Sequence, residues 1–176
     1  GNRTVTATFT QDEYTLTINK IGNGSVSKNP NQATYHYGDV VTLSATADAG
    51  WTFAGFSGDT TTSTTVTMNG NRTVTATFTQ DEYTLTINTI GNGSVSKSPD
   101  QATYHYGDVV TLGATADAGW TFTGFSGDTT TSNTVTMNGN RTVTATFTQD
   151  EYILTINTVG NGSVSKSPDQ ATYHYG

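Results

Sequence analysis

Apolar and polar residues alternate along most of this chain. In residues 83–88, Tyr-Thr-Leu-Thr-Ile-Asn, the apolar side chains fall on one face and the polar ones on the other. Residues 73–79, Thr-Val-Thr-Ala-Thr-Phe-Thr, repeat this period of two. Such alternation is typical of half-buried strands. No segment has the period of a helix, so the pattern predicts an all-β protein.

Turn residues divide the alternating segments into short strands. We expect further strands at 103–106, 108–116, 120–125 and 134–137, separated by turns at 97–100, 117–119 and 126–128. In residues 90–94, Ile-Gly-Asn-Gly-Ser, an Asn-Gly pair indicates a β-hairpin between its flanking strands. The pattern gives about seven short antiparallel strands in each 69-residue stretch and no helix.

The chain is built from a tandem repeat. Gly-Asn-Arg-Thr-Val begins at residues 1, 70 and 139, which sets a period of 69 residues. Segments 14–82 (the first module) and 83–151 (the second module) differ at six positions only: Lys20/Thr89, Asn29/Ser98, Asn31/Asp100, Ser44/Gly113, Ala54/Thr123 and Thr64/Asn133. We therefore interpret 1–13 as the closing strand of a preceding repeat and 152–176 as the first part of a further one.

A 69-residue module lies near the lower size limit for an independent core, since it buries only about 60% of its unfolded surface. The alternation predicts the following inward residues in the second module: Tyr83, Leu85, Ile87, Val95, Tyr104, Tyr106, Val110, Leu112, Trp120, Phe122, Phe125, Val135, Met137, Val143 and Phe147. The junctions at 80–83 and 149–152 contain no Pro or Gly, so we expect a stiff array instead of flexibly linked modules.

Composition excludes several functional classes. The 14 acidic and 7 basic side chains give a net charge of −7 without any basic run, which argues against nucleic acid and anionic lipid as partners. No apolar run approaches the roughly 18 residues of a membrane span. Without Cys there are no disulfides, thiolate metal sites or Cys nucleophiles. The chain opens without Met or a signal sequence, so we expect a segment of a longer protein.

These motifs resemble a known family. Tyr-Thr-Leu-Thr-Ile, Gly-Asn-Gly-Ser-Val and above all residues 119–128, Gly-Trp-Thr-Phe-Thr-Gly-Phe-Ser-Gly-Asp, are similar to the divergent internalin B-type repeat of prokaryotic surface proteins. Phe125, like Phe56 in the first module, stands where that family usually carries a second Trp. The resemblance covers the whole chain. It implies small β modules, sometimes described as β-grasp-like, arranged in tandem in extracellular and cell-wall proteins. We therefore expect each helix-free antiparallel module to be either β-grasp-like or a small sandwich.

The residues offer no catalytic set, so we expect no enzyme and no cofactor. Each repeat has a single His (His36, His105 and His174), and repeats about 30 Å apart cannot bring two of them to one metal ion. The acidic residues are spread over turns, where they cap turns and promote solubility. Calcium needs 6–8 converging oxygens. A weak Ca²⁺ site formed by Asp117 and Asp128, which flank the aromatic strand, stays open as an alternative.

The aromatic residues of residues 51–56 and 120–125 have two interpretations. The first makes them core anchors, which a small module needs. The second makes them an exposed platform around Trp51 and Trp120 that binds cell-surface carbohydrate or another partner. The residues concerned are Trp51, Phe53, Phe56, Trp120, Phe122 and Phe125.

Two Asn-x-Ser/Thr sequons recur in each repeat, both at predicted turns. They are Asn2, Asn71 and Asn140 in Asn-Arg-Thr, and Asn23, Asn92 and Asn161 in Asn-Gly-Ser. Asn also suits such turns for conformational reasons, so turn formation and N-glycan attachment both stay open. The one Lys per repeat in a Lys-x-Pro turn (Lys28, Lys97 and Lys166) is poorly placed for a buried isopeptide bond.

Adjacent repeats are nearly identical. This near-identity favours a function that increases with the number of copies, and the property that each copy adds is length. We therefore expect a non-enzymatic, extracellular or cell-surface array that forms a rod-like stalk or fibre. In one form a single chain spaces an adhesin from the cell. In the other, chains polymerise by strand exchange. The expected partners are neighbouring repeats of the same chain or other copies of the same protein.

Overall fold

The alternating segments form strands, as the sequence predicts. The computed structural model describes residues 1–175; Gly176, which belongs to the opening part of the expected further repeat, lies outside them. Within residues 1–175 every regular element is a strand, from β1 to β14, and the chain divides into two compact units, Gly1–Asp81 and Glu82–Gly176. The all-β class in tandem modules is confirmed. None of residues 1–175 forms a helix of the length and apolarity required to cross a bilayer.

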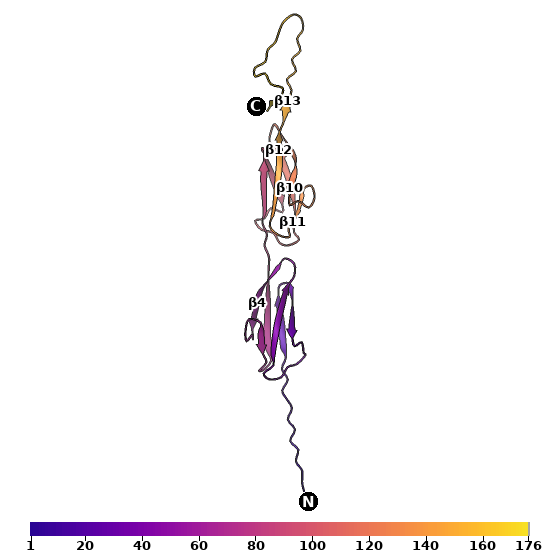
Figure 1. The fold of residues 1–176 in the computed structure, drawn as a ribbon, viewed down its shortest axis with the longest axis vertical. Helices are drawn as coiled ribbons and strands as arrows, with labels where there is room; N and C mark the ends of the chain where they lie inside the picture. The colour runs from indigo at the N-terminus through magenta and orange to yellow at the C-terminus, as the bar shows by residue number, and fades with distance from the viewer. Residues whose placement is uncertain (176) are drawn as a thin grey trace. The chain divides into compact units, whose positions relative to one another are not determined.

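Each module is a sandwich of two three-stranded sheets, the second of the two architectures that the sequence left open (Figure 1). In the first module one sheet has the order β1 (Leu16–Ile21), β6 (Arg72–Gln80), β4 (Trp51–Gly58). The other has the order β2 (Gly24–Asn29), β3 (Val40–Ala47), β5 (Thr65–Thr67).

The second module repeats this arrangement strand by strand. One sheet contains β7 (Leu85–Ile90), β12 (Arg141–Gln149) and β10 (Trp120–Gly127), with β12 in the centre. The other contains β8 (Gly93–Ser98), β9 (Val109–Ala116) and β11 (Thr134–Thr136), with β9 in the centre. β10 carries a bulge between Phe122 and Gly124, as β4 does between Phe53 and Gly55.

The expectation of purely antiparallel modules is wrong for one pairing. β7 pairs with β12 in parallel, from Leu85 opposite Arg141 to Ile90 opposite Thr146, and β1 pairs with β6 in the same way. These are the first and last strands of each module. The chain between them passes through the other sheet, so it returns in the direction in which it started.

The predicted hairpin at 90–94 is also wrong. β7 and β8 belong to different sheets, and β8 pairs with β9. The glycines of this turn serve close packing. A Cβ at Gly91 would lie 2.2 Å from the carbonyl oxygen of Phe147 and 2.7 Å from the Trp120 ring. Gly91 also has a φ of +80°, a region that residues with a Cβ rarely adopt. The turn therefore crosses from one sheet to the other over one end of the sandwich.

The core of each module lies between its two sheets. In the second module its buried members are Leu85, Tyr104, Val110, Leu112, Val135, Met137 and Val143, with Tyr83, Ile87 and Phe125 packed against them. Phe147 is buried as well, and no polar or charged residue among those described is buried. The alternation predicts these core positions correctly.

Tyr106 is an exception, since it was expected to point inward. It is 49% exposed, and the equivalent Tyr37 is 71% exposed. Instead of a strand at 103–106, the structure has a single bridge between Tyr104 and Tyr83, after which the chain turns. The N–H of His105 donates to Asp108 Oδ2 (2.8 Å), and the N–H of Asp108 donates to the carbonyl of His105 (3.1 Å). The turn ends the period of two, so Tyr106 no longer follows Tyr104 inward.

Residues outside the two modules form little regular structure. Residues 1–13 contain no strand although their sequence matches β6, and Val5 and Phe9 are more than nine-tenths exposed. Beyond the second module, β13 (Glu151–Tyr152) pairs antiparallel with β14 (Tyr173–His174). The residues between them trace the open yellow loop in Figure 1. In a complete module, the strands that pair with the equivalent of this loop come from later in the repeat.

Candidate functional site

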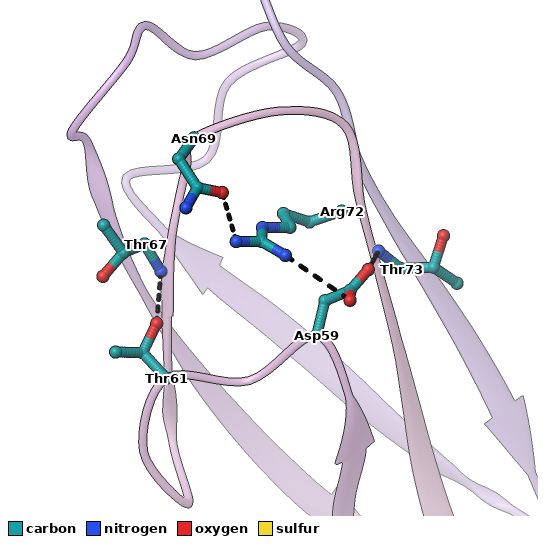
Figure 2. Close-up of polar contacts among 6 residues, drawn as sticks. All are labelled: Asp59, Thr61, Thr67, Asn69, Arg72 and Thr73. Carbon is teal, nitrogen blue, oxygen red and sulfur yellow. Dashed lines mark hydrogen bonds and ion pairs between the residues drawn. The ribbon is translucent and has the colours of Figure 1, made fainter.

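The most concentrated set of polar contacts in the first module surrounds Asp59, at the end of β4 (Figure 2). The Asp59 N–H donates to the carbonyl of Thr73, and the N–H of Thr73 donates to Asp59 Oδ2, both at 2.9 Å. Arg72 Nη1 forms an ion pair with Asp59 Oδ1 at 3.5 Å. These contacts fasten the loop after β4 to the start of β6, and we call them the Asp59 clamp.

Two further bonds complete the Asp59 clamp. Arg72 Nη2 donates to the side-chain oxygen of Asn69, and the N–H of Thr67 donates to Thr61 Oγ1 at 2.7 Å (Figure 2). The Nε of Arg72 is buried without a hydrogen-bond partner. Every other polar group named here has a hydrogen-bond or ion-pair partner in the same module. The Asp59 clamp therefore holds loops in place, and its polar groups are not directed at a ligand.

The second module repeats the clamp with nearly the same dimensions. Asp128 Oδ2 accepts from the Thr142 N–H at 2.9 Å, and Asp128 Oδ1 lies 3.4 Å from Arg141 Nη1. Sequence reasoning missed this role for Asp128 and Arg141. The one available signal was their recurrence with the 69-residue period, which applies equally to every other residue of the repeat.

The two acids proposed for a weak Ca²⁺ site do not converge. Asp117 precedes β10 and Asp128 follows it. A strand of that length spans about 26 Å at about 3.3 Å per residue. Both carboxylate oxygens of Asp128 already accept hydrogen bonds within the clamp. Residues 1–175 contain no cluster of three or more His, Cys, Asp or Glu side chains able to hold a metal ion.

Two of the three histidines lie beside backbone carbonyls. His174 Nδ1 contacts the carbonyl of Asp150, and His36 Nδ1 contacts the carbonyl of Asp12, each at 3.2 Å. His105 is partly buried in the turn after Tyr104. These contacts place the His36 and His174 rings at the openings of their repeats.

The six aromatic residues considered as core anchors or as a binding platform are all half-buried: Trp51, Phe53, Phe56, Trp120, Phe122 and Phe125. Phe56 and Phe125 pack against the cores of their modules. Phe122 lies between Phe125 and Phe147, at ring-centroid distances of 4.8 and 5.4 Å. The Trp120 ring covers the Gly91 turn. These rings close the edge of the sandwich and keep part of their surface in solvent.

The two kinds of sequon differ in their surroundings. Asn140 Oδ1 accepts from the N–H of Thr84 at 3.0 Å and from its hydroxyl at 3.3 Å, which ties the turn before β12 to the start of β7. Asn71 does the same for Thr15. By contrast, Asn23 and Asn92 lie exposed in the turns that cross between the sheets. Asn2 and Asn161 are exposed in the segments outside the modules.

Lysine makes local contacts in each Lys-x-Pro turn. Lys97 Nζ lies 3.1 Å from Asp100 Oδ1 and 5.8 Å from the centre of the Tyr104 ring. The hydrogen bond that Lys97 donates to the Asp100 carboxylate raises the pKa of Lys97 above 10.5. Lys28 and Lys166 lie in the same way over Tyr35 and Tyr173. None of these three lysines is buried.

Comparison with known proteins gives one family. The family model of the divergent InlB B-repeat domain matches this chain twice in tandem, over residues 14–82 and 83–151. The match confirms the resemblance seen in the motifs. No curated protein matches the chain.

Proposed function

This chain belongs to the divergent InlB B-repeat family, a family of repeat domains of surface proteins, and we propose that it is a non-enzymatic structural segment of an extracellular protein. Its function is to supply length. In the first form of the proposal, the repeats are the stalk that holds an adhesive domain away from the cell. In the second, chains assemble into a filament.

The observation that carries this proposal is the equivalence of the two modules. They share their sheets, their cores and the clamp around Asp59 and Asp128. The clustered polar groups bond within the module, and the sequences of the two modules differ at six positions only. A binding protein needs one good copy of its site, whereas a spacer gains from each added copy.

The surface chemistry is consistent with a solvated extracellular array. Thr, with 40 residues, fills most outward strand positions, where it combines strand propensity with a hydroxyl group that water solvates. The net charge of −7 keeps copies apart in solution. If the protein is on the surface, a protease added to intact source cells will release peptides of residues 83–151 before cytoplasmic proteins are cut.

The length hypothesis is tested by inserting one, two or four extra copies of residues 83–151 after Glu151 and measuring the maximum dimension by small-angle X-ray scattering. A spacer gives a constant increment per copy. A control series with equally long Gly/Ser insertions grows only as about the square root of the residue number. Increments that shrink to those of the control would contradict the proposal.

Light scattering over a concentration series separates the stalk from the filament. A monomer mass that does not change with concentration supports the stalk. Growth with concentration into filaments with an axial repeat, visible by negative-stain microscopy, supports polymerisation through strand exchange between chains.

N-glycans are proposed at Asn23 and Asn92, in hosts that glycosylate folded chains. Their side chains are exposed in turns, whereas the side-chain oxygens of Asn71 and Asn140 are held by hydrogen bonds. Glycopeptide mass spectrometry of the protein from its source will find Asn92 occupied in preference to Asn140. Preferential occupancy of Asn140 would contradict this assignment.

Carbohydrate binding is the second candidate function. A shallow recess of about 250 Å³ at the β10 bulge is lined by Thr123, Gly124, Phe125, Ser126 and Thr146. It combines one aromatic face with hydroxyl groups, the chemistry that sugars use. Glycan-array binding that Phe125→Ala removes and Phe147→Leu retains would favour this role over a purely structural one.

A further inference from the structure

Asp150 makes hydrogen bonds to the second module and to the residues that follow it. On the module side, its N–H donates to the carbonyl of Gly119 at 2.8 Å, and its Oδ1 accepts from Thr121 Oγ1 at 2.6 Å. On the other side, its carbonyl lies 3.2 Å from His174 Nδ1. One residue thus fixes the end of β12 to β10 and holds the opening of the next repeat.

The short β13–β14 ladder brings residues far apart in sequence to the same place. Glu151 lies opposite His174, and Tyr152 lies opposite Tyr173. Because β13 directly continues the chain from Asp150, the ladder carries the segment 173–175 back to the edge of the second module.

Tyr175 then packs directly on Gly119. A Cβ at Gly119 would lie 2.2 Å from the Tyr175 Cβ and 2.6 Å from its Cγ, so the two residues touch only because Gly119 has no side chain. Gly119 also has a φ of +76°. Glycine is required here by the backbone and by the tyrosine together.

We propose that the edge formed by Gly119, Thr121 and Asp150 is a docking surface whose occupant is the Tyr-His-Tyr segment of the following repeat, here residues 173–175. Docking makes the order of that segment depend on the folded module before it. The stability of an array then includes a nearest-neighbour contribution in addition to the stabilities of single modules. This coupling goes beyond the proposed function, because it is present whether the array is a spacer, a filament or a binding protein.

Comparison with the first unit distinguishes the contact made within the opening of a repeat from the contact that docks this opening on the preceding module. Asp12 and His36 make the same carbonyl–imidazole contact at the same distance as Asp150 and His174, so that contact belongs to the opening of a repeat itself. The contact between Tyr175 and Gly119 is different because it reaches back to a complete module. Tyr37 has the same local sequence as Tyr175 but follows residues 1–13, which contain no strand, and this makes it a matched control.

Residue-resolved hydrogen exchange on the full chain tests the proposal. In Tyr175→Ala we expect the amides of Asp150, Tyr152 and Tyr173 to exchange roughly tenfold faster, because local opening no longer has to break the Tyr175 contact. Tyr175→Phe keeps the ring and restores the slow exchange. Tyr37→Ala leaves these three amides unchanged, and the β9 amides report that the second module stays folded.

If these amides exchange in Tyr175→Ala at rates within twofold of those in the unaltered chain, the proposal is overturned. Equal acceleration in Tyr175→Phe and Tyr175→Ala would overturn it as well, since the ring would then contribute nothing. As a second measurement, a nuclear Overhauser effect between the Gly119 Hα and the Tyr175 ring is expected in the unaltered chain, and its absence would also overturn the docking geometry.

Discussion

The ring of Phe78 lies directly against the Cα of Gly24. A Cβ at Gly24 would come within 2.4 Å of Phe78 Cε1, and the equivalent distance between Gly93 and Phe147 is 2.5 Å. Phe78 and Phe147 are each 2% exposed, so neither ring has space to withdraw. The turn that crosses between the sheets can therefore pass over the sandwich only with glycine at these two positions.

Replacing Gly93 by Ala should destabilise the second module by about 1–3 kcal/mol, the usual cost of inserting a methyl group into a packed core. Urea unfolding followed by NMR measures this, because positions such as Gly113 and Ser44 give the two modules separate signals. Gly139→Ala is the control. A Cβ there meets nothing within 4 Å, so we expect a change below about 0.5 kcal/mol. Equal effects of the two substitutions would contradict the Phe147 contact.

Leu112 and Phe122 should differ in their contribution to stability although the alternation predicts both to point inward. Leu112 is 2% exposed in the core, and Leu112→Ala should cost about 2–5 kcal/mol as a buried large-to-small change. Phe122 is half-buried at the edge, so Phe122→Ala should cost less. The same NMR-monitored urea titration compares them. A larger loss for Phe122→Ala would show that the edge aromatics form the principal core.

Removing the Asp128 carboxylate should destabilise the second module by about 1–3 kcal/mol, because Asp128→Ala leaves the Thr142 N–H and the Arg141 Nη1 group without their acceptor. Asp100→Ala removes a more exposed ion pair with Lys97 and should cost less than about 1 kcal/mol. Thermal unfolding of both variants provides the comparison. If Asp128→Ala costs no more than Asp100→Ala, the clamp does not stabilise the fold.

The pKa of Lys97 should fall toward 10.5 in Asp100→Asn, since the hydrogen bond that Lys97 donates to the Asp100 carboxylate is the main cause of its elevation. Because the pKa of Lys97 is higher in the folded state, its protonated form stabilises the fold. This stabilisation is complete below the unfolded-state pKa and is lost as the pH rises through the folded-state pKa. The effect on stability is therefore confined to alkaline pH and is small for an exposed pair. NMR titration of the Lys97 side chain measures it. An unchanged pKa in Asp100→Asn would exclude Asp100 as the cause.

Local pattern was sufficient to predict most of the strands and most of the core. Alternation placed Leu85, Val110, Leu112 and Val143 on the inward face, since a strand sends successive side chains to opposite sides wherever it lies. The 69-residue period and the resemblance identified the repeat and its family before any geometry was known. Tyr106 was predicted wrongly because a turn, which the alternation does not register, follows Tyr104.

Partners far apart in the chain were decided only by the tertiary structure. Asn-Gly between two alternating segments favours a hairpin, and the Thr-rich strands are too similar for their pattern to select a partner. Two contacts between such partners, Gly93 with Phe147 between the sheets and Asp128 with Thr142 within one sheet, join residues separated by most of a module or by a loop. The docking of Tyr175 on Gly119 is of the same kind. Sequence periodicity determined which residues face inward, while long-range packing determined which strands meet, because alternation describes one strand at a time.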